Sequence, residues 1–187
     1  KETVFLSNGD YRLRISSAGG GTSMFDDVLL TRYHRDSLGE QSGTFTYLYD
    51  HKSEALWSPT YAPTRIVGEK VKTVFGDEKV RFFKRVGGIA TMLEVSVAQN
   101  EHAEFRTLEI TNEREVNAFL SVAQYAEVSL AKPMDDIRHP EFQKLFVMSD
   151  ILPGDDCLLF SRVDPADHSS QVFLATLAKS SRKDMQF

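Results

Sequence analysis

The sequence predicts an all-β domain, a large antiparallel β-sandwich with only a few short helical turns. Apolar and polar residues alternate with a period of two in many short segments, most clearly in residues 11–16 and 93–97. This alternation is typical of strands with one buried face. Turn-forming residues separate the segments at short spacing, and no stretch of ten residues carries a strong helical pattern. Short spacing favours hairpins, which join antiparallel strands.

The predicted strands follow one another along the chain. Two hairpins are specified by their turns, because Gly76-Asp77-Glu78 and Gly87-Gly88 tolerate the positive φ angles of tight turns. The best helical candidate, 133–142, is interrupted by Pro140, so we expect one or two turns there. About a dozen strands with so little helix favour a large sandwich over a small barrel. In chain order, the strands are predicted to begin near Val4 and then to span 11–16, 28–33, 44–49, 66–75, 80–86, 93–97, 105–111, 119–128, 145–149, 157–163 and 172–177.

Length and composition fit one compact domain. The chain has 187 residues, of which 41% are apolar and 26% are charged. This is enough apolar surface for a folded core but leaves little for two independent cores. We therefore predict a single domain over residues 1–187. The chain begins with Lys1 rather than with methionine, and a strand is already predicted at Val4. We therefore expect the chain to be a fragment of a larger multidomain protein.

Charge and cysteine content exclude several classes of function. The formal net charge is −5 and basic residues are scattered among acidic ones, so nucleic acid is not an expected partner. No apolar run approaches the roughly 18 to 20 residues that span a bilayer, so we expect no membrane insertion by this piece. Cys157 is the only cysteine, which excludes an intrachain disulfide and fits a cytoplasmic location. The histidines are dispersed without a metal-binding spacing, so we expect neither a metal site nor a cofactor.

A triple glycine, Gly19-Gly20-Gly21, is the first conspicuous motif. A phosphate-binding loop would need a following lysine and a helix N-terminus, and the sequence offers neither. We therefore interpret the motif as a tight turn or bulge of the backbone.

Residues 30–36 combine two guanidinium groups, a phenol, an imidazole and a carboxylate at a strand end. Such groups form bidentate hydrogen bonds with vicinal hydroxyls, and aromatic faces cover the apolar face of a pyranose ring. Arg32 and Tyr33 are therefore candidate carbohydrate-binding residues. A solvated strand end with local ion pairs is an equal alternative.

Residues 55–64 form an aromatic, proline-rich segment that carries Trp57, the one tryptophan of the chain, and Tyr61. Prolines keep this segment out of a central strand. Trp57 and Tyr61 are candidates for a stacking platform under a sugar ring. The competing interpretation, which is favoured for a lone tryptophan, is that Trp57 is a packing residue.

No catalytic set stands out from the sequence. A glycosidase needs two carboxylates that face one sugar across a gap, and no pair is distinguished by its position. Cys157 lies in an apolar segment and is expected to be a buried strand thiol rather than a nucleophile. We therefore name no catalytic residue.

Several short segments carry a resemblance to a known family, and they keep a collinear order over about residues 4–150. The segments are 6–11, 18–23, 31–33, 47–50, 57–64, 108–112, 125–128 and 139–147. Together they resemble the N-terminal β-sandwich of family 94 glycoside phosphorylases and cyclic β-1,2-glucan synthases. The resemblance is weaker after Ile151, and one departure is Thr22, where relatives commonly have tyrosine after the triple glycine.

The resemblance implies a galactose-mutarotase-like supersandwich fold. In this family the catalytic acid lies in a helical (α/α)6 barrel that follows the sandwich, so the resemblance implies a non-catalytic piece of a glycosyltransferase or phosphorylase. The implied partners are the catalytic domain of the same parent chain, a β-glucan or oligosaccharide and, as a further alternative, a second copy in a homodimer. An inner-membrane parent with this domain on its cytoplasmic side is compatible with the resemblance.

Three functions remain open from the sequence. The first is a carbohydrate-binding or interdomain module. The second is a purely structural interface domain for the barrel. The third is a mutarotase-type epimerase, which needs a general base and a general acid near a ring oxygen, and no histidine-containing segment resembles that catalytic stretch.

Overall fold

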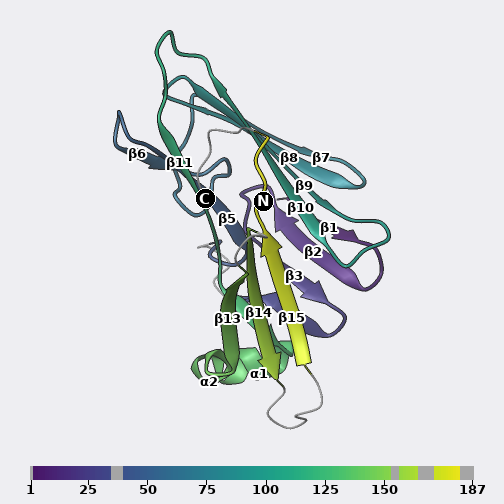
Figure 1. Cartoon of the computed structure of the whole chain (residues 1–187). Coiled ribbons are helices and arrows are strands. Elements are labelled where there is room, and N and C mark those ends of the chain that lie inside the picture. The colour runs from purple at the N-terminus through teal and green to yellow at the C-terminus, as the bar shows by residue number, and fades with distance from the viewer. Residues whose placement is uncertain (1, 35–39, 153–155, 164–170, 182–187) are drawn as a thin grey trace.

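A computed structural model describes residues 2–34, 40–152, 156–163 and 171–181 (Figure 1). Within these residues the chain forms fifteen strands and two short helices, which confirms the predicted all-β fold class. The first strands are β1 (Thr3–Ser7), β2 (Tyr11–Ser16), β3 (Gly21–Phe25), β4 (Val28–Thr31), β5 (Thr44–Asp50), β6 (Ala55–Trp57), β7 (Lys70–Phe75) and β8 (Lys79–Val86). The remaining elements are β9 (Ile89–Val97), β10 (Glu104–Asn112), β11 (Leu120–Ala126), β12 (Val128–Ala131), α1 (Pro133–Arg138), α2 (Pro140–Lys144), β13 (Val147–Leu152), β14 (Cys157–Val163) and β15 (Gln171–Leu177).

The strands form four antiparallel sheets. Sheet A has the order β1-β2-β3-β4-β12, and sheet B has the order β11-β5-β6. Sheet C has the order β10-β9-β8-β7, and sheet D has the order β13-β14-β15. Most neighbours in a sheet are consecutive in the chain, as expected for hairpins. The exceptions are β11 and β12, which return to β5 and β4 and so tie the middle of the chain to its beginning.

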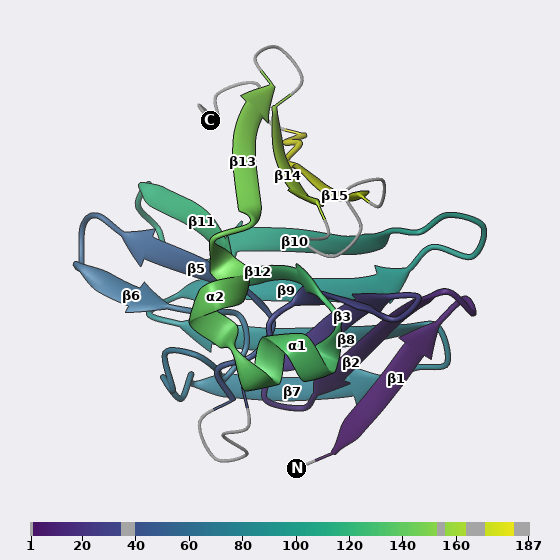
Figure 2. The same cartoon turned by 90° about the horizontal axis from the view of Figure 1, so that it is seen from below.

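The core lies between these sheets. Leu13 and Ile15 of sheet A pack against Phe82, Leu93 and Val95 of sheet C. A second cluster joins sheet A to sheet D, and a third joins sheet B to sheet C. Figure 2 shows sheet C behind sheet A, with α1 and α2 toward the viewer. Sheet A is therefore covered by sheets C and D, the arrangement of a large sandwich.

The predicted turns and helices are confirmed. The β7–β8 hairpin closes with a 2.8 Å hydrogen bond from the Gly76 amide to the Lys79 carbonyl. The β8–β9 turn has positive φ angles at Gly87 and Gly88, which glycine adopts without strain. Pro140 begins α2 directly after α1, so the predicted helical segment is two short helices rather than one.

Several strands depart from the prediction. The predicted strand 66–75 begins only at Lys70, and the predicted strand 145–149 runs from Val147 to Leu152. The strands β3 and β6 are short and lack clear alternation, so the sequence pattern did not indicate them. The predicted strand 119–128 is two strands, because the chain changes sheets at Glu127. At that point the Glu127 carbonyl accepts a 2.8 Å hydrogen bond from the Arg32 amide, and pairing with β4 begins. Local periodicity does not reveal such a change of partner.

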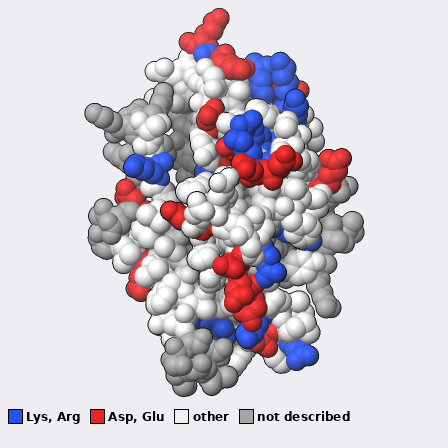
Figure 3. Space-filling model, turned by 90° about the vertical axis from the view of Figure 1, so that its right-hand side faces the viewer, with Lys and Arg blue, Asp and Glu red and all other residues white. Residues whose placement is uncertain are grey.

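Neither of the two helices within the described residues has the length or the apolar character needed to cross a bilayer. On the face drawn in Figure 3, basic and acidic side chains are interspersed rather than gathered in a stripe of one sign. Ion pairs such as Arg81–Glu94 and Arg85–Glu113 show the same mixing on sheet C.

A buried carboxylate closes the end of sheet B. Asp50, the last residue of β5, accepts hydrogen bonds from the Lys52 amide at 3.0 Å and the Ser53 hydroxyl at 2.8 Å. Its Oδ2 also lies 2.7 Å from Nη1 of Arg114. Burial alone would raise the pKa of Asp50, but these hydrogen bonds and the Arg114 charge lower it from 3.8 to about 2. The ionised form is therefore the one that the fold stabilises.

Asp50→Asn is expected to lower the free energy of unfolding at pH 7 by about 2 kcal/mol, because it removes charge-assisted hydrogen bonds from a buried group. A carboxyl with a depressed pKa stabilises the fold above its ordinary pKa, and this contribution is lost as the pH falls from about 4 to about 2. The difference in free energy of unfolding between wild type and Asp50→Asn should therefore become smaller as the pH falls from about 4 to about 2. Urea unfolding at pH 7 and at several pH values below 4 measures this difference. A difference that does not change with pH would contradict a lowered pKa for Asp50.

Candidate functional site

Arg32 lies directly after β4 and is buried in a network of ion pairs. Its Nη2 donates to Oδ1 of Asp136 at 2.8 Å, and its Nε lies 3.1 Å from Oδ2 of the same carboxylate. Its Nη1 donates to Glu127 at 2.8 Å, and Nη2 also reaches the Pro140 carbonyl at 3.0 Å. The guanidinium therefore ties the end of β4 to α1 and α2. Its donors are turned into the protein rather than toward a ligand.

The neighbours of Arg32 are also engaged. The ring of Tyr33 is half-buried and lies under the Arg14 guanidinium, 5.2 Å from its centroid. Nε2 of His34 lies 2.7 Å from Oε2 of Glu127, whose other oxygen contacts Lys144 at 3.1 Å. A histidine and a glutamate in direct contact leave no room for a sugar between them. Arg35 and Asp36 of the predicted motif lie outside the described residues.

Trp57 is a packing residue in this structure. Its side chain is 1% exposed and packs with Leu48 and Ile89 between sheets B and C. No ring face is free for stacking, which agrees with the alternative interpretation drawn from its being a lone tryptophan. Tyr61, at 44% exposed, lies in the loop that follows and is accessible.

Lys84 and the triple glycine hold this loop in place. The buried Lys84 Nζ donates to the Ser58 carbonyl at 3.0 Å and to the Thr60 carbonyl at 2.9 Å. Burial lowers the pKa of Lys84 to about 8. Gly19 has a φ of 94°, and a Cβ there would overlap the Thr60 side chain. The motif is thus a tight turn against the loop, as predicted, and among the described residues no hydrogen bond or ring contact joins Arg32 or Tyr33 to Trp57 or Tyr61.

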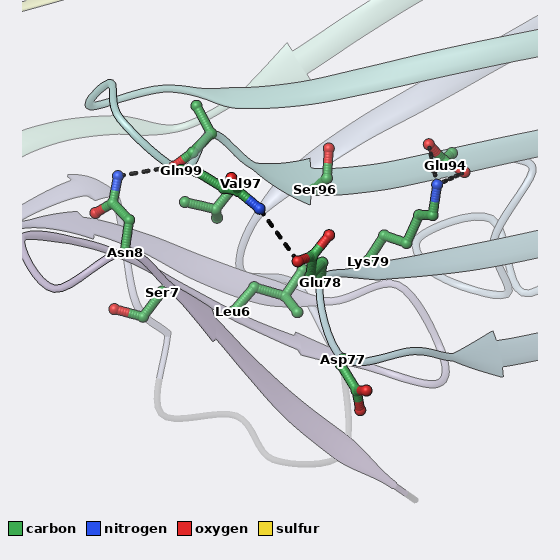
Figure 4. A pocket seen from close by; sticks show the side chains of 11 residues that line it. Leu6, Ser7, Asn8, Asp77, Glu78, Lys79, Glu94, Ser96, Val97 and Gln99 are labelled. Atoms are coloured by element: carbon green, nitrogen blue, oxygen red, sulfur yellow. Dashed lines mark hydrogen bonds and ion pairs between the residues drawn. The ribbon is translucent and has the colours of Figure 1, made fainter.

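A polar hollow of about 340 Å³ lies at one end of the sandwich, where the β1–β2, β7–β8 and β9–β10 turns meet (Figure 4). Several of its polar groups are paired with one another. Nε2 of Gln99 donates to Glu78 at 3.1 Å, and Nζ of Lys79 lies 3.2 Å from Glu94. Nδ2 of Asn8 donates to the Ala98 carbonyl at 2.9 Å. The lining of the hollow is mainly polar and contains neither a histidine nor a cysteine.

The described residues also contain no group of three or more histidine, cysteine or acidic side chains that could hold a metal ion. His168 lies outside them. Cys157 is buried in β14, as predicted for a strand thiol.

The outer face of sheet B carries a group of tyrosines that sequence reasoning missed. Tyr47 and Tyr49 point to the same side of β5, and register places Ala123 and Ser121 opposite them on β11. Tyr125 lies diagonal to Tyr47 on this side, and Leu56 of β6 lies opposite Tyr49. We call this surface the tyrosine face; it comprises Tyr47, Tyr49, Leu56, Ser121, Ala123 and Tyr125. The spacing Tyr47-Leu48-Tyr49 could have indicated part of it, since residues two apart share a face.

Sheet D carries large apolar side chains on both of its faces, although Asp150 and Gln171 also lie on the outer one. One face places Phe160, Val172 and Leu174 against the core of sheet A. The opposite face carries Phe173, which is 57% exposed, and Leu177, which is also exposed. Met148 on β13 lies on the same side as Phe173, because both pair with Ser161 of β14. We call the side with Met148, Phe173 and Leu177 the outer face of sheet D.

These features define a class of protein: a large antiparallel β-sandwich module with buried ion pairs at Arg32 and Asp50 and with exposed aromatic or apolar side chains on sheets B and D. The chain belongs to the glycosyl hydrolase 94 supersandwich domain family, which matches residues 1–186. It is 36% identical over 162 residues to the cyclic beta-(1,2)-glucan synthase NdvB of Rhizobium meliloti (strain 1021). The match covers 87% of this chain but 6% of that relative, so the chain spans a small part of the relative's length. The resemblance drawn from the sequence is confirmed.

Proposed function

We propose that this chain is a non-catalytic supersandwich module that packs against the catalytic part of a larger enzyme, a cyclic β-1,2-glucan synthase or a related glycoside phosphorylase. The observation that carries the proposal is the presence of large apolar side chains on both faces of sheet D. An antiparallel sheet with one face in water normally alternates apolar and polar residues. A sheet with large apolar side chains on both sides is suited to burial on both sides, and exposed apolar patches mark interaction surfaces.

The contacts of the polar residues support a role without chemistry of its own. Glu94 of the polar hollow and Glu127 of the Arg32 network are held in ion pairs, and Glu78 accepts a hydrogen bond from Gln99. A mutarotase-type epimerase is less favoured, because the His34–Glu127 pair is closed by direct contact. We also propose that residues 1–187 form one domain and that this domain lies in the cytoplasm.

The proposal is tested by replacing Phe173 with serine in the full parent enzyme and in this chain alone. In the parent, Phe173→Ser is expected to cost about 2 kcal/mol of stability at the contact, because a large apolar side chain loses its buried surface. In the isolated chain the same change should alter the free energy of unfolding by less than about 0.5 kcal/mol. Hydrogen exchange measured by mass spectrometry over β13–β15 gives the readout, with stronger protection expected in the parent than in the isolated chain.

Phe5→Ser is the matched control, because Phe5 is 71% exposed on β1, at the edge of sheet A. It should leave the exchange of sheet D unchanged in the parent. Equal exchange of β13–β15 in the parent and in the isolated chain would overturn the proposed packing role.

Sugar contact is a second candidate function. The specific observation that favours it is the presence of accessible tyrosine rings, Tyr61 on its loop and Tyr125 on sheet B. Of the residues proposed from the sequence for this role, Tyr61 has the most accessible ring, whereas Arg32 and Trp57 are buried.

A further inference from the structure

The tyrosine face differs in chemistry from the outer face of sheet D. Its six side chains include three phenols and one serine hydroxyl, and none of them carries a carboxylate, ammonium or guanidinium group. Burial and the neighbouring Tyr125 raise the pKa of Tyr47, so its hydroxyl stays neutral near pH 7. The surface therefore offers aromatic faces with hydroxyl donors and acceptors, but no charge.

The three rings differ in accessibility, because Tyr47 and Tyr49 are half-buried and Tyr125 is exposed. Ala123 and Ser121, the partners of Tyr47 and Tyr49 across β5 and β11, are small residues. Tyr125 is 53% exposed, and Leu56 is also exposed at the β6 edge. Side chains two apart on a strand, or diagonal across a pair, lie about 7 Å apart. Three rings at this spacing form a broad platform rather than a closed pocket.

His51 fixes one end of the platform. Its ring packs edge-on against Tyr49, with centroids 5.0 Å apart and an interplanar angle of 83°. Its Nε2 lies 2.8 Å from the Ser121 hydroxyl on the opposite strand. These contacts restrict the orientation of the Tyr49 ring before any ligand arrives, which lowers the entropic cost of binding.

We propose that the tyrosine face is a binding surface for a neutral glucan chain, with pyranose rings stacked on Tyr47, Tyr49 and Tyr125. Amphipathic aromatic rings suit such a ligand, because each pyranose has an apolar C–H face and a rim of hydroxyls. The absence of charge on the platform matches an uncharged ligand better than a peptide or nucleic acid. The relative's printed name, a cyclic beta-(1,2)-glucan synthase, supplies the glucan class. This inference goes beyond the packing role of sheet D and does not depend on it.

The test is a titration of the chain with linear β-1,2-gluco-oligosaccharides, followed by NMR of ring-labelled tyrosine. The sequence has six tyrosines, so each signal can be assigned by single replacement. Saturable shifts are expected at Tyr47, Tyr49 and Tyr125, with no shift at the buried Tyr11. Tyr49→Ala should weaken binding about tenfold, because it removes one ring contact. The same titration with β-1,4- and β-1,3-gluco-oligosaccharides measures whether the tyrosine shifts depend on the glucan linkage.

Two further variants keep the result decisive. Ala123→Glu places a charge between the rings at an exposed strand position, and it should abolish the shifts while the amide spectrum stays that of a folded protein. Phe105→Ala, at an exposed aromatic residue of sheet C outside the platform, should leave binding unchanged. Absence of shifts at 10 mM oligosaccharide, or binding that survives both Tyr49→Ala and Ala123→Glu, would overturn the inference. Phe173→Ser should leave the tyrosine shifts unchanged. Glucan binding on the tyrosine face can therefore be tested separately from the packing role of sheet D.

Discussion

Replacing Arg32 with alanine is expected to lower the free energy of unfolding by about 4 kcal/mol. The change removes the bidentate partner of Asp136, whose side chain is buried in α1, and one partner of Glu127. An unpaired carboxylate in that position loses its counter-charge without gaining water. The end of β4 also loses its link to the Pro140 carbonyl at the start of α2. The segment α1–α2 should therefore loosen before the rest of the fold.

Urea unfolding at pH 7 measures the Arg32→Ala effect, and Arg81→Ala is its matched control. Arg81 also contacts a glutamate, at 2.6 Å, but on the exposed face of sheet C, where such pairs contribute less than about 1 kcal/mol. Arg32→Lys should fall between them, because it keeps the charge but loses the planar fork. If Arg32→Ala and Arg81→Ala lowered the free energy of unfolding equally, the Arg32 network would contribute no more to stability than an exposed ion pair.

Trp57→Ala is expected to cost a similar amount, about 4 kcal/mol, for a different reason. The indole fills space between sheets B and C against Leu48 and Ile89, and its removal leaves a cavity that strands on both sides cannot close. Tyr61→Ala, four residues further on and exposed, should change the free energy of unfolding by less than about 1 kcal/mol.

Trp57 also provides the optical readout for this comparison. Because it is the one tryptophan and is buried, its emission should shift to longer wavelength on unfolding. Addition of β-1,2-glucan to the folded chain should leave its emission unchanged, even if glucan binds to the tyrosine face. A glucan-dependent change in Trp57 emission, with the fold intact, would instead support the stacking role first considered for this residue.

The strands, hairpins and helices were predictable to the extent that their signals are local. Alternation in β2 and β9, the turns at Gly76 and Gly87, and the break at Pro140 all act within a few residues. The family resemblance was recoverable because its segments keep their order along the chain. The strand change at Glu127 was not predictable, because it depends on which earlier strand each half pairs with.

The candidate site residues also divide into features that the local sequence predicts and features that depend on contacts between distant residues. Arg32 and Trp57 have side chains that suit sugar recognition, and composition alone cannot tell whether they face solvent or the interior. Their partners Asp136, Glu127 and Ile89 are distant in sequence, so only folding brings them into contact. Tyr47 and Tyr49 were recognisable as a pair on one face, whereas Tyr125 joins them through the β5–β11 register.

The sequence by itself determined an all-β supersandwich of the glycosyl hydrolase 94 family, because turn chemistry, alternation and collinear motifs are written along the chain. Only the tertiary structure decided which aromatic and charged residues are free. Burial depends on long-range strand pairing and on the packing of one sheet against another, and neither is a property of any short segment. For that reason Arg32 and Trp57 became structural residues, and an outward tyrosine face emerged on sheet B.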